Sequence, residues 1–268
     1  MRIRIGFDLI FETSAPTPAL LMLYVHPSRQ SDLLEPEQLN LEPNVPVWNF
    51  IDGFGNKVGR IVMPQGQLRI RHNAVIQDIG QLDVPGIGAR QHPVEELPVE
   101  ILPYLLASRY CEVDRMTEIA WAHFSHLPFG WPRVQAVMSW VHNHITFGYA
   151  FARSTKSAYD AYIEQRGVCR DFMHLSITLL RALNIPARYT TGYLGDIGVP
   201  VDPNPMDFSA WFEVYLGNRW WTCDARHNQP RIGRVLMATG RDATDVALTT
   251  SFGSTVLKQF IVVTEELK

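Results

Sequence analysis

The spacing of hydrophobic residues changes along this chain, and that change limits the folds that it can adopt. Near the start, hydrophobic residues from Ile3 to Phe11 alternate with polar residues or glycine, which is the period of a half-buried β-strand. Between residues 172 and 183 they recur every three or four positions, the period of an amphipathic helix. A stretch rich in proline, glycine and acidic residues, 83–103, lies between the two patterns. The chain therefore predicts a β part followed by an α+β part.

The first ninety or so residues predict an all-β unit. Short β-like runs are separated by turn sequences such as Asp52-Gly53-Phe54-Gly55-Asn56. We expect two sheets packed as a sandwich. Because 268 residues exceed the usual size of a single core, we divide the chain into an all-β domain, 1–92, and an α+β core domain, 93–268. The strands are expected at 20–25, 45–51, 57–63 and 67–75, in addition to the first one.

Helical spacing predominates after the linker. A helix is expected to begin at Pro132, because proline suits the first helical position. A hairpin is expected to turn at Gly217-Asn218. Further helices are expected at 104–110, 114–123 and 157–165, and strands at 187–194, 208–215, 219–224 and 260–264.

Composition argues against several functional classes. The formal net charge of −3 provides no basic field for nucleic acid. No hydrophobic run approaches the roughly 20 residues that cross a bilayer, and the start lacks the features of a signal peptide. The three cysteines are too few and too widely spaced for a disulfide framework or a four-cysteine zinc site. We therefore expect a cytoplasmic protein that binds neither nucleic acid nor membrane.

Cys169 is the main candidate for a reactive group. It follows Gly167-Val168 and opens the amphipathic helix. Unpaired backbone N–H groups and the helix dipole favour a thiolate at such a position. Most free cysteines, however, are small buried hydrophobes. Position alone leaves a reactive thiol and a buried one equally open.

Three motifs follow one another in the second unit. They are Gly167-Val168-Cys169-Arg170-Asp171-Phe172, then 183–189 with 192–194, and finally 210–215 with 220–224. In order and spacing they resemble the transglutaminase-like superfamily of cysteine enzymes, and the β part is similar to the N-terminal domain of bacterial members. The resemblance implies a papain-like α+β core with a cysteine, a histidine and an aspartate. It also implies acyl-transfer chemistry on amides: proteolysis, deamidation or transamidation.

Carried over to this sequence, the resemblance makes Cys169 the nucleophile and Asp224 the aspartate, but it puts Ser209 at the histidine position. A two-residue turn at Gly217-Asn218 would place Ser209 and Asp224 diagonally on one face of the hairpin. Ser209 therefore occupies the position of the family's histidine without any shift in the register of the hairpin. A serine hydroxyl neither stabilises a thiolate nor protonates a leaving amine near neutral pH.

His227 is the better candidate for a substitute base. It follows Asp224 by three residues, and a bend after the strand would return its ring towards the site. A loop role, in which its ring bonds a backbone carbonyl, is an equally good interpretation. His174 lies about 140° around the helix from Cys169, on the side of Thr178 and Arg181, and we discount it.

Two further predictions concern the surroundings of this site. Cys223 should point away from Asp224 and into the core, because neighbouring side chains of a strand face opposite ways. A charged segment follows the hairpin, and we interpret it only as a network at an interface between domains. Its members are Arg231, Arg234, Arg241, Asp242 and Asp245.

Two functions stay open on the sequence. In the first, Cys169 attacks an amide of a peptide or protein substrate, its own backbone N–H helps hold the oxyanion, and Asp224 orients His227 or bonds Ser209. In the second, a pseudoenzyme keeps the groove for binding peptides or proteins. We expect no cofactor and no metal, since His123 and His126 have no further ligands at suitable spacing. The substrate, hydrolysis versus transamidation, Ca²⁺ dependence and oligomeric state are left open.

Overall fold

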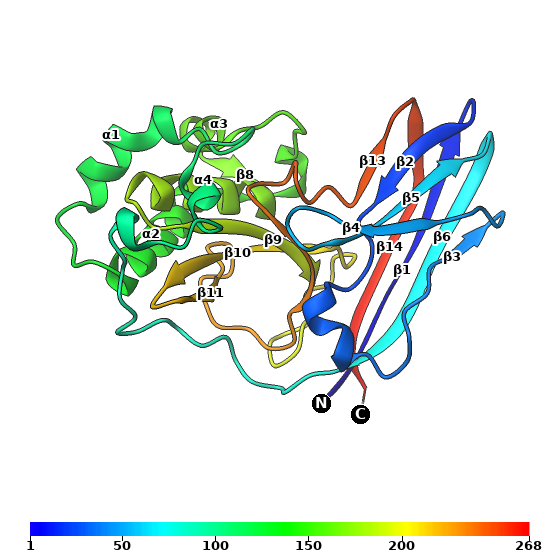
Figure 1. The fold of residues 1–268 in the computed structure, drawn as a ribbon, viewed down its shortest axis with the longest axis horizontal. Helices are drawn as coiled ribbons and strands as arrows, with labels where there is room; N and C mark the ends of the chain where they lie inside the picture. The colour runs from blue at the N-terminus through cyan, green and yellow to red at the C-terminus, as the bar shows by residue number, and fades with distance from the viewer. Residues whose placement is uncertain (268) are drawn as a thin grey trace.

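Two four-stranded antiparallel sheets form one lobe of the computed structural model, which describes residues 1–267 (Figure 1). Their strand orders are β14-β1-β6-β3 and β13-β2-β5-β4. One buried cluster joins Ile5 and Leu9 of the first sheet to Leu21 and Met63 of the second, so the sheets pack as the expected sandwich. The strands are β1 (Arg2–Thr13), β2 (Thr17–Leu21), β3 (Asn40–Glu42), β4 (Trp48–Ile51), β5 (Lys57–Met63), β6 (Gly66–Gln77), β13 (Thr249–Ser251) and β14 (Thr255–Leu267).

The two C-terminal strands require a correction to the expected division at residue 92. β14 pairs with β1 along its whole length, and β13 pairs with β2. Val262 of β14 is only 4% exposed and lies in the core of the sandwich. Residues 249–267 therefore belong to the sheets of the first lobe, because β1 and β2 need partners on their free edges.

The second lobe contains a four-stranded antiparallel sheet, β11-β10-β9-β12, and the α-helices (Figure 1). Helix α4 packs against β9 and β10 and also against α1, α2 and α3, so it is the central element of this lobe. This arrangement is the expected α+β core. The elements are α1 (Val113–Phe124), α2 (Trp131–His144), β7 (Thr146–Phe147), α3 (Ala158–Glu164), β8 (Arg166–Gly167), α4 (Cys169–Ala182), β9 (Ala187–Tyr193), β10 (Ser209–Leu216), β11 (Arg219–Cys223) and β12 (Val235–Gly240).

Helix α4 is buried on all sides, including the polar side that the sequence predicted for His174, Thr178 and Arg181. His174 and Thr178 are fully buried, and Arg181 is 2% exposed. The Arg181 guanidinium donates to the carbonyl oxygens of Leu106, Ala187 and Arg241. Residues distant in sequence therefore cover the polar side of the helix and satisfy its hydrogen bonds.

The hairpin of β10 and β11 has the expected register. Gly217 and Asn218 both have positive φ, 58° and 65°, as a type I′ turn requires. Leu216 pairs with Arg219, and Phe212 pairs with Cys223.

The prediction of a helix at 104–110 is wrong. A 3-10 helix, Leu102–Leu105, ends at the start of that range, and the next helix begins at Val113. The side chain of Tyr104 instead packs edge-on against Trp220 of the hairpin.

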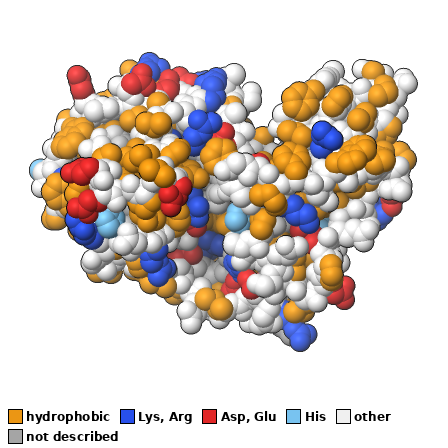
Figure 2. All heavy atoms as spheres, in the orientation of Figure 1, with side chains coloured by type: hydrophobic (Ala, Val, Ile, Leu, Met, Phe, Trp, Pro, Cys, Tyr) orange, Lys and Arg blue, Asp and Glu red, His pale blue; other side chains and the backbone are white. Residues whose placement is uncertain are grey.

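The surface is notched between the upper parts of the two lobes (Figure 2). Hydrophobic side chains gather on the visible face of the β lobe in this view. Exposed residues of this kind include Trp48, Phe50 and Ile51 of the edge strand β4. Within residues 1–267, no helix has the length and hydrophobicity needed to cross a membrane.

The place of β14 in the sandwich predicts how two valines on this strand respond to truncation. Val262→Ala should lower the free energy of unfolding by about 2 kcal/mol, because a buried valine loses its packing. Val256→Ala, on the same strand but 51% exposed, is the matched control and should change it by less than about 0.5 kcal/mol. Urea denaturation followed by circular dichroism measures both. Equal effects would contradict a core position for Val262.

Candidate active site

The turn that carries Cys169 is held by Asp171. The Val168 N–H donates to Asp171 Oδ2 at 2.9 Å, and Arg170 Nε donates to Oδ1 at 3.2 Å. Asp171 is fully buried, and a Cβ atom at Gly167 would lie only 2.6 Å from its Oδ2. Glycine is therefore needed where the chain passes the carboxylate, and the carboxylate fixes the first turn of α4 with Cys169 at its start.

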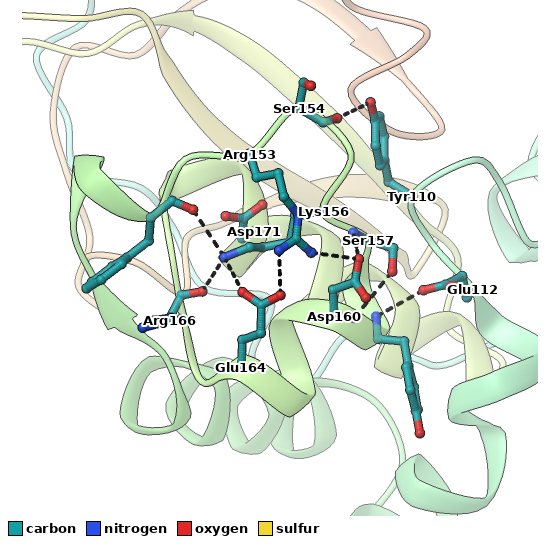
Figure 3. Close-up of polar contacts among 12 residues, drawn as sticks. Tyr110, Glu112, Arg153, Ser154, Lys156, Ser157, Asp160, Glu164, Arg166 and Asp171 are labelled. Atoms are coloured by element: carbon teal, nitrogen blue, oxygen red, sulfur yellow. Dashed lines mark hydrogen bonds and ion pairs between the residues drawn. The ribbon is translucent and has the colours of Figure 1, made fainter.

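A buried lysine ties the preceding loop to this turn (Figure 3). Lys156 is 1% exposed and donates to the carbonyl oxygens of Phe151 and Arg166 at 3.1 and 2.9 Å. It also pairs with Glu164 Oε2 at 3.0 Å, while Arg153 pairs with Oε1 of the same carboxylate at 2.7 Å. Arg166 belongs to β8, immediately before the turn. The network therefore fixes the chain that leads into Cys169.

Asp224 and His227 form a hydrogen-bonded pair after β11. His227 Nδ1 lies 2.8 Å from Asp224 Oδ2, and Oδ1 accepts from the backbone N–H groups of Arg226 and His227 at 3.0 and 3.1 Å. The bend after β11 returns the ring to the carboxylate, which is the first of the two interpretations left open for His227. Nε2 of His227 is left free of Asp224. Among the described residues, Asp224 makes no hydrogen bond with Ser209.

Arg234 is the second partner of this carboxylate, and sequence reasoning missed it. Its guanidinium donates to Asp224 Oδ2 and to Asp83 Oδ2, both at 2.9 Å, and the side chain is buried. Burial raises the pKa of Asp224, but the Arg234 charge and the His227 hydrogen bond outweigh it and hold the pKa well below its usual range. The charged run in the sequence was the only signal, and no spacing rule links residue 234 to residues 83 and 224.

His142 supports the bend from the opposite side. Its Nδ1 lies 3.0 Å from the carbonyl oxygens of both Ala225 and Arg226, to which an N–H at this position would donate. His142 is in the last turn of α2. Helix α2 therefore fixes the segment that presents His227.

Cys169 is half-buried, and its surroundings favour the neutral thiol over the thiolate. Burial raises its pKa to about 11, and the nearby Asp207 carboxylate acts in the same direction. The Arg226 charge and the backbone N–H groups of Arg170 and Ala210 act in the opposite direction. Burial thus outweighs the stabilisation expected from the helix start. Within residues 1–267, no hydrogen bond joins Cys169 to His227.

Ser209 lines the same cavity as His227. It is the first residue of β10 and pairs with Gly192 of β9. Its Oγ is buried and has no hydrogen-bond partner among the described residues. The N–H of the next residue, Ala210, acts on the Cys169 thiol. Contacts of Ser209, Asp224 and His227 and of their chain neighbours Ala210 and Arg226 thus link the segments that carry the four residues singled out from the sequence.

Comparison with known proteins agrees with this arrangement. The family model described as "Transglutaminase-like superfamily" matches residues 126–225. A crystal structure from Cytophaga hutchinsonii, described as a "Putative Cysteine Protease", has 30% sequence identity and a TM-score of 0.87 over 100% of this chain and 91% of that one. The chain belongs to the transglutaminase-like superfamily.

Two other similarities are weaker or cover only part of the chain. An uncharacterized protein of Mycobacterium leprae is 32% identical over 120 residues, which span 42% of this chain and less than half of that relative's length. The periplasmic domain of TgpA from Pseudomonas aeruginosa is 14% identical over 84% of this chain and 88% of that one, with a TM-score of 0.43.

Other residues of this transglutaminase-like chain lie outside the site. His174 Nε2 accepts from the Ala243 N–H at 3.1 Å, and burial lowers the pKa of its ring. Cys223 is 3% exposed in the hydrophobic core, as expected. Trp211, which the family motif includes, is also in this core. Within residues 1–267, no three His, Cys, Asp or Glu side chains come together as metal ligands.

The Asp224 carboxylate predicts a pH-dependent contribution to stability. Its pKa is lowered by folding, so this contribution is complete above the ordinary carboxyl pKa of about 3.9 and is lost as the pH falls towards the folded-state value. Asp224→Asn should therefore cost about 3 kcal/mol of unfolding free energy at pH 7, because the buried Arg234 loses one of its two carboxylate partners and keeps only Asp83. The difference from wild type should shrink below about pH 4.

Urea denaturation between pH 7 and pH 3 measures this difference. Glu118→Gln, in the exposed part of α1, removes one charge elsewhere and serves as the control. If Asp224→Asn lowers the free energy of unfolding equally at pH 7 and pH 3, folding does not lower the pKa of Asp224.

Proposed function

We propose that this transglutaminase-like protein is a cysteine-dependent enzyme that cleaves or transfers the acyl group of peptide or protein amides. The observation that carries the proposal is the Asp224–His227 hydrogen bond beside the strand that begins with Ser209 and Ala210. It supplies an oriented imidazole although the motif's histidine position holds serine. The likeness to the Cytophaga protein described as a "Putative Cysteine Protease" supports the same class.

The proposed mechanism couples a proton transfer to the attack of the thiol on the amide. With Nδ1–H donated to Asp224, His227 presents Nε2 as an acceptor for the Cys169 proton. The sulfur attacks the amide carbon, and the oxyanion accepts a hydrogen bond from the backbone N–H of Cys169. The His227 imidazolium then protonates the leaving amine, which departs and leaves a thioester. Water or an amine attacks the thioester, His227 takes its proton, and Cys169 regains that proton as the thiol.

The raised pKa of Cys169 determines when the proton moves. At about 11, the thiol is protonated near neutral pH before substrate arrives. Proton transfer to His227 therefore accompanies the attack instead of preceding it. The Arg226 charge, which favours the thiolate, lowers the free-energy cost of that step.

We also propose a reducing, cytoplasmic location, which the three free cysteines support.

Removal of the imidazole provides the first test. His227→Ala should lower kcat on casein, followed as released primary amines, by at least about 100-fold, because the general acid and base is lost. His126→Ala changes an exposed histidine outside the site and should leave kcat within about twofold. Activity that survives in His227→Ala and disappears in Cys169→Ala would contradict the assignment of His227 as the base.

A pseudoenzyme that only binds peptides is the alternative, and three observations favour it. The motif's histidine position is Ser209, the Cys169 thiol is protonated near neutral pH, and no hydrogen bond joins Cys169 to His227 in the part of the chain described. On this alternative, wild type is inactive and a histidine at position 209 restores turnover.

The variant Ser209→His separates the two functions. We expect wild-type turnover and less than about a tenfold gain in the variant, because Asp224 Oδ2 is already bonded by His227 and Arg234 and cannot orient a new imidazole. The measurement is the same amine release, with wild type and His227→Ala assayed together. An inactive wild type and an active Ser209→His would establish the pseudoenzyme instead.

A further inference from the structure

Asp83, at the start of the linker, is fixed against the segment that precedes β12. Its backbone N–H donates to the Arg231 carbonyl oxygen at 2.9 Å, and its Oδ2 accepts from the Arg231 N–H at 3.0 Å. The neighbouring residues Leu82 and Ile232 form an antiparallel bridge. These contacts join segments that are 148 positions apart in the sequence. The backbone around residue 231 therefore places the Asp83 carboxylate.

Arg234 lies between two carboxylates and divides its N–H groups between them. Its Nε donates to Asp83 Oδ2 and its Nη2 donates to Asp224 Oδ2, both at 2.9 Å. The side chain is only 7% exposed, and its Nη1 has no hydrogen-bond partner among the described residues. An unpaired N–H of a buried guanidinium is costly, so Nε would need another acceptor if Asp83 were absent.

The acceptor positions of Asp224 are already filled. An ionised carboxylate has about four acceptor positions, two on each oxygen. Oδ1 accepts from the backbone N–H groups of Arg226 and His227 at 3.0 and 3.1 Å. Oδ2 accepts from His227 Nδ1 at 2.8 Å and from Arg234 Nη2 at 2.9 Å. A further donor at this carboxylate would therefore displace one that is present.

Arg234 would be that further donor if its Nε were released from Asp83. Arginine prefers to bind a carboxylate through two N–H groups at once. Its charge also makes it a stronger donor than a neutral imidazole. The His227 N–H is therefore the group that a second Arg234 N–H would displace from Oδ2, because the two donors at Oδ1 are backbone groups of the bend itself.

We propose that Asp83 is a positioning residue: by holding Nε of Arg234, it limits Arg234 to one hydrogen bond with Asp224 and so reserves Oδ2 for the His227 imidazole. The proposal rests on the proposed function, since it concerns the orientation of the same base. Asp83 acts through Arg234, because it makes no hydrogen bond with Cys169 or His227 within residues 1–267. The start of the linker between the two lobes thereby has a role in the site.

The tautomer of the His227 ring tests this role without any need for turnover. Long-range ¹H–¹⁵N correlation spectra of protein labelled with ¹⁵N-histidine show which ring nitrogen carries the hydrogen, and His227→Ala identifies the signal. The spectra are recorded at about pH 9, well above the ordinary histidine value of about 6.5. Wild type should carry the hydrogen on Nδ1, as the bond to Asp224 requires. In Asp83→Ala, most molecules should carry it on Nε2, because Arg234 takes Oδ2.

Two further changes at this position separate loss of the acceptor from loss of the fold. Asp83→Ser keeps an acceptor for the Arg231 N–H but is one bond shorter, so it should release Arg234 and give the same result as Asp83→Ala. Asp83→Asn keeps an acceptor of the same length and should retain the hydrogen on Nδ1. Near-ultraviolet circular dichroism shows which variants are folded.

Removal of the competing donor is the strongest test. In the double variant Asp83→Ala/Arg234→Met, the hydrogen should return to Nδ1, since His227 is then the only side chain that donates to Oδ2. Asp8→Asn is the matched control. It removes a carboxylate paired with Arg69 in the β lobe and 21% exposed, against 19% for Asp83, and should leave His227 unchanged.

Hydrogen that stays on Nδ1 in the folded Asp83→Ala or Asp83→Ser variant, or that does not return to Nδ1 in the double variant, would overturn the proposal. Activity provides a second measurement. With casein, Asp83→Ala should lower kcat by about tenfold or more and leave KM within about twofold, because the base is misoriented while the groove is unchanged.

The tautomer and the activity can fail independently. An inactive wild type with the expected tautomers would reject the proposed function and leave the role of Asp83 standing. An active wild type whose tautomer and kcat do not respond to Asp83→Ala would overturn the role of Asp83 and leave the proposed function standing.

Discussion

The buried carboxylate of Asp224 is the group on which the arrangement of the site depends. A charge in a protein interior is costly unless it is paired and hydrogen-bonded, and Asp224 meets that requirement with two backbone N–H groups, Arg234 and His227. These bonds fix the bend after β11, orient the imidazole and draw Asp83 of the linker towards the site through Arg234. The histidine is therefore positioned as a consequence of satisfying one buried charge.

Burial in low-dielectric surroundings also acts on Cys169, but there it favours the neutral form of the side chain. Asp224 has strong partners and stays ionised, whereas the thiol has only weak ones and stays protonated. The helix start alone therefore does not make a reactive thiolate here. In the proposed mechanism, reactivity depends on Arg226, on His227 and on what a substrate brings into the cavity beside Ser209.

The β lobe contributes to the same framework. Its core includes Tyr193 of β9, Phe208 before β10 and Met237 of β12. Asn56 of the β lobe exchanges hydrogen bonds with the backbone of Thr239 at 2.8 Å in both directions. The loop that lines the cavity therefore begins and ends in the core of the sandwich, so loss of packing there would reach the site.

The sequence by itself determined the local features: strands from alternation, α4 from its three-and-four spacing, the hairpin register from Gly217-Asn218, and Cys169, Ser209 and Asp224 from motif order. These depend on neighbours within a few residues or on one turn. Tertiary structure alone decided the features that join distant segments. It placed β14 beside β1, buried the polar side of α4, bonded Arg234 to Asp224 and raised the pKa of Cys169. Burial and charge pairing depend on what the fold brings together, and local spacing carries no information about that.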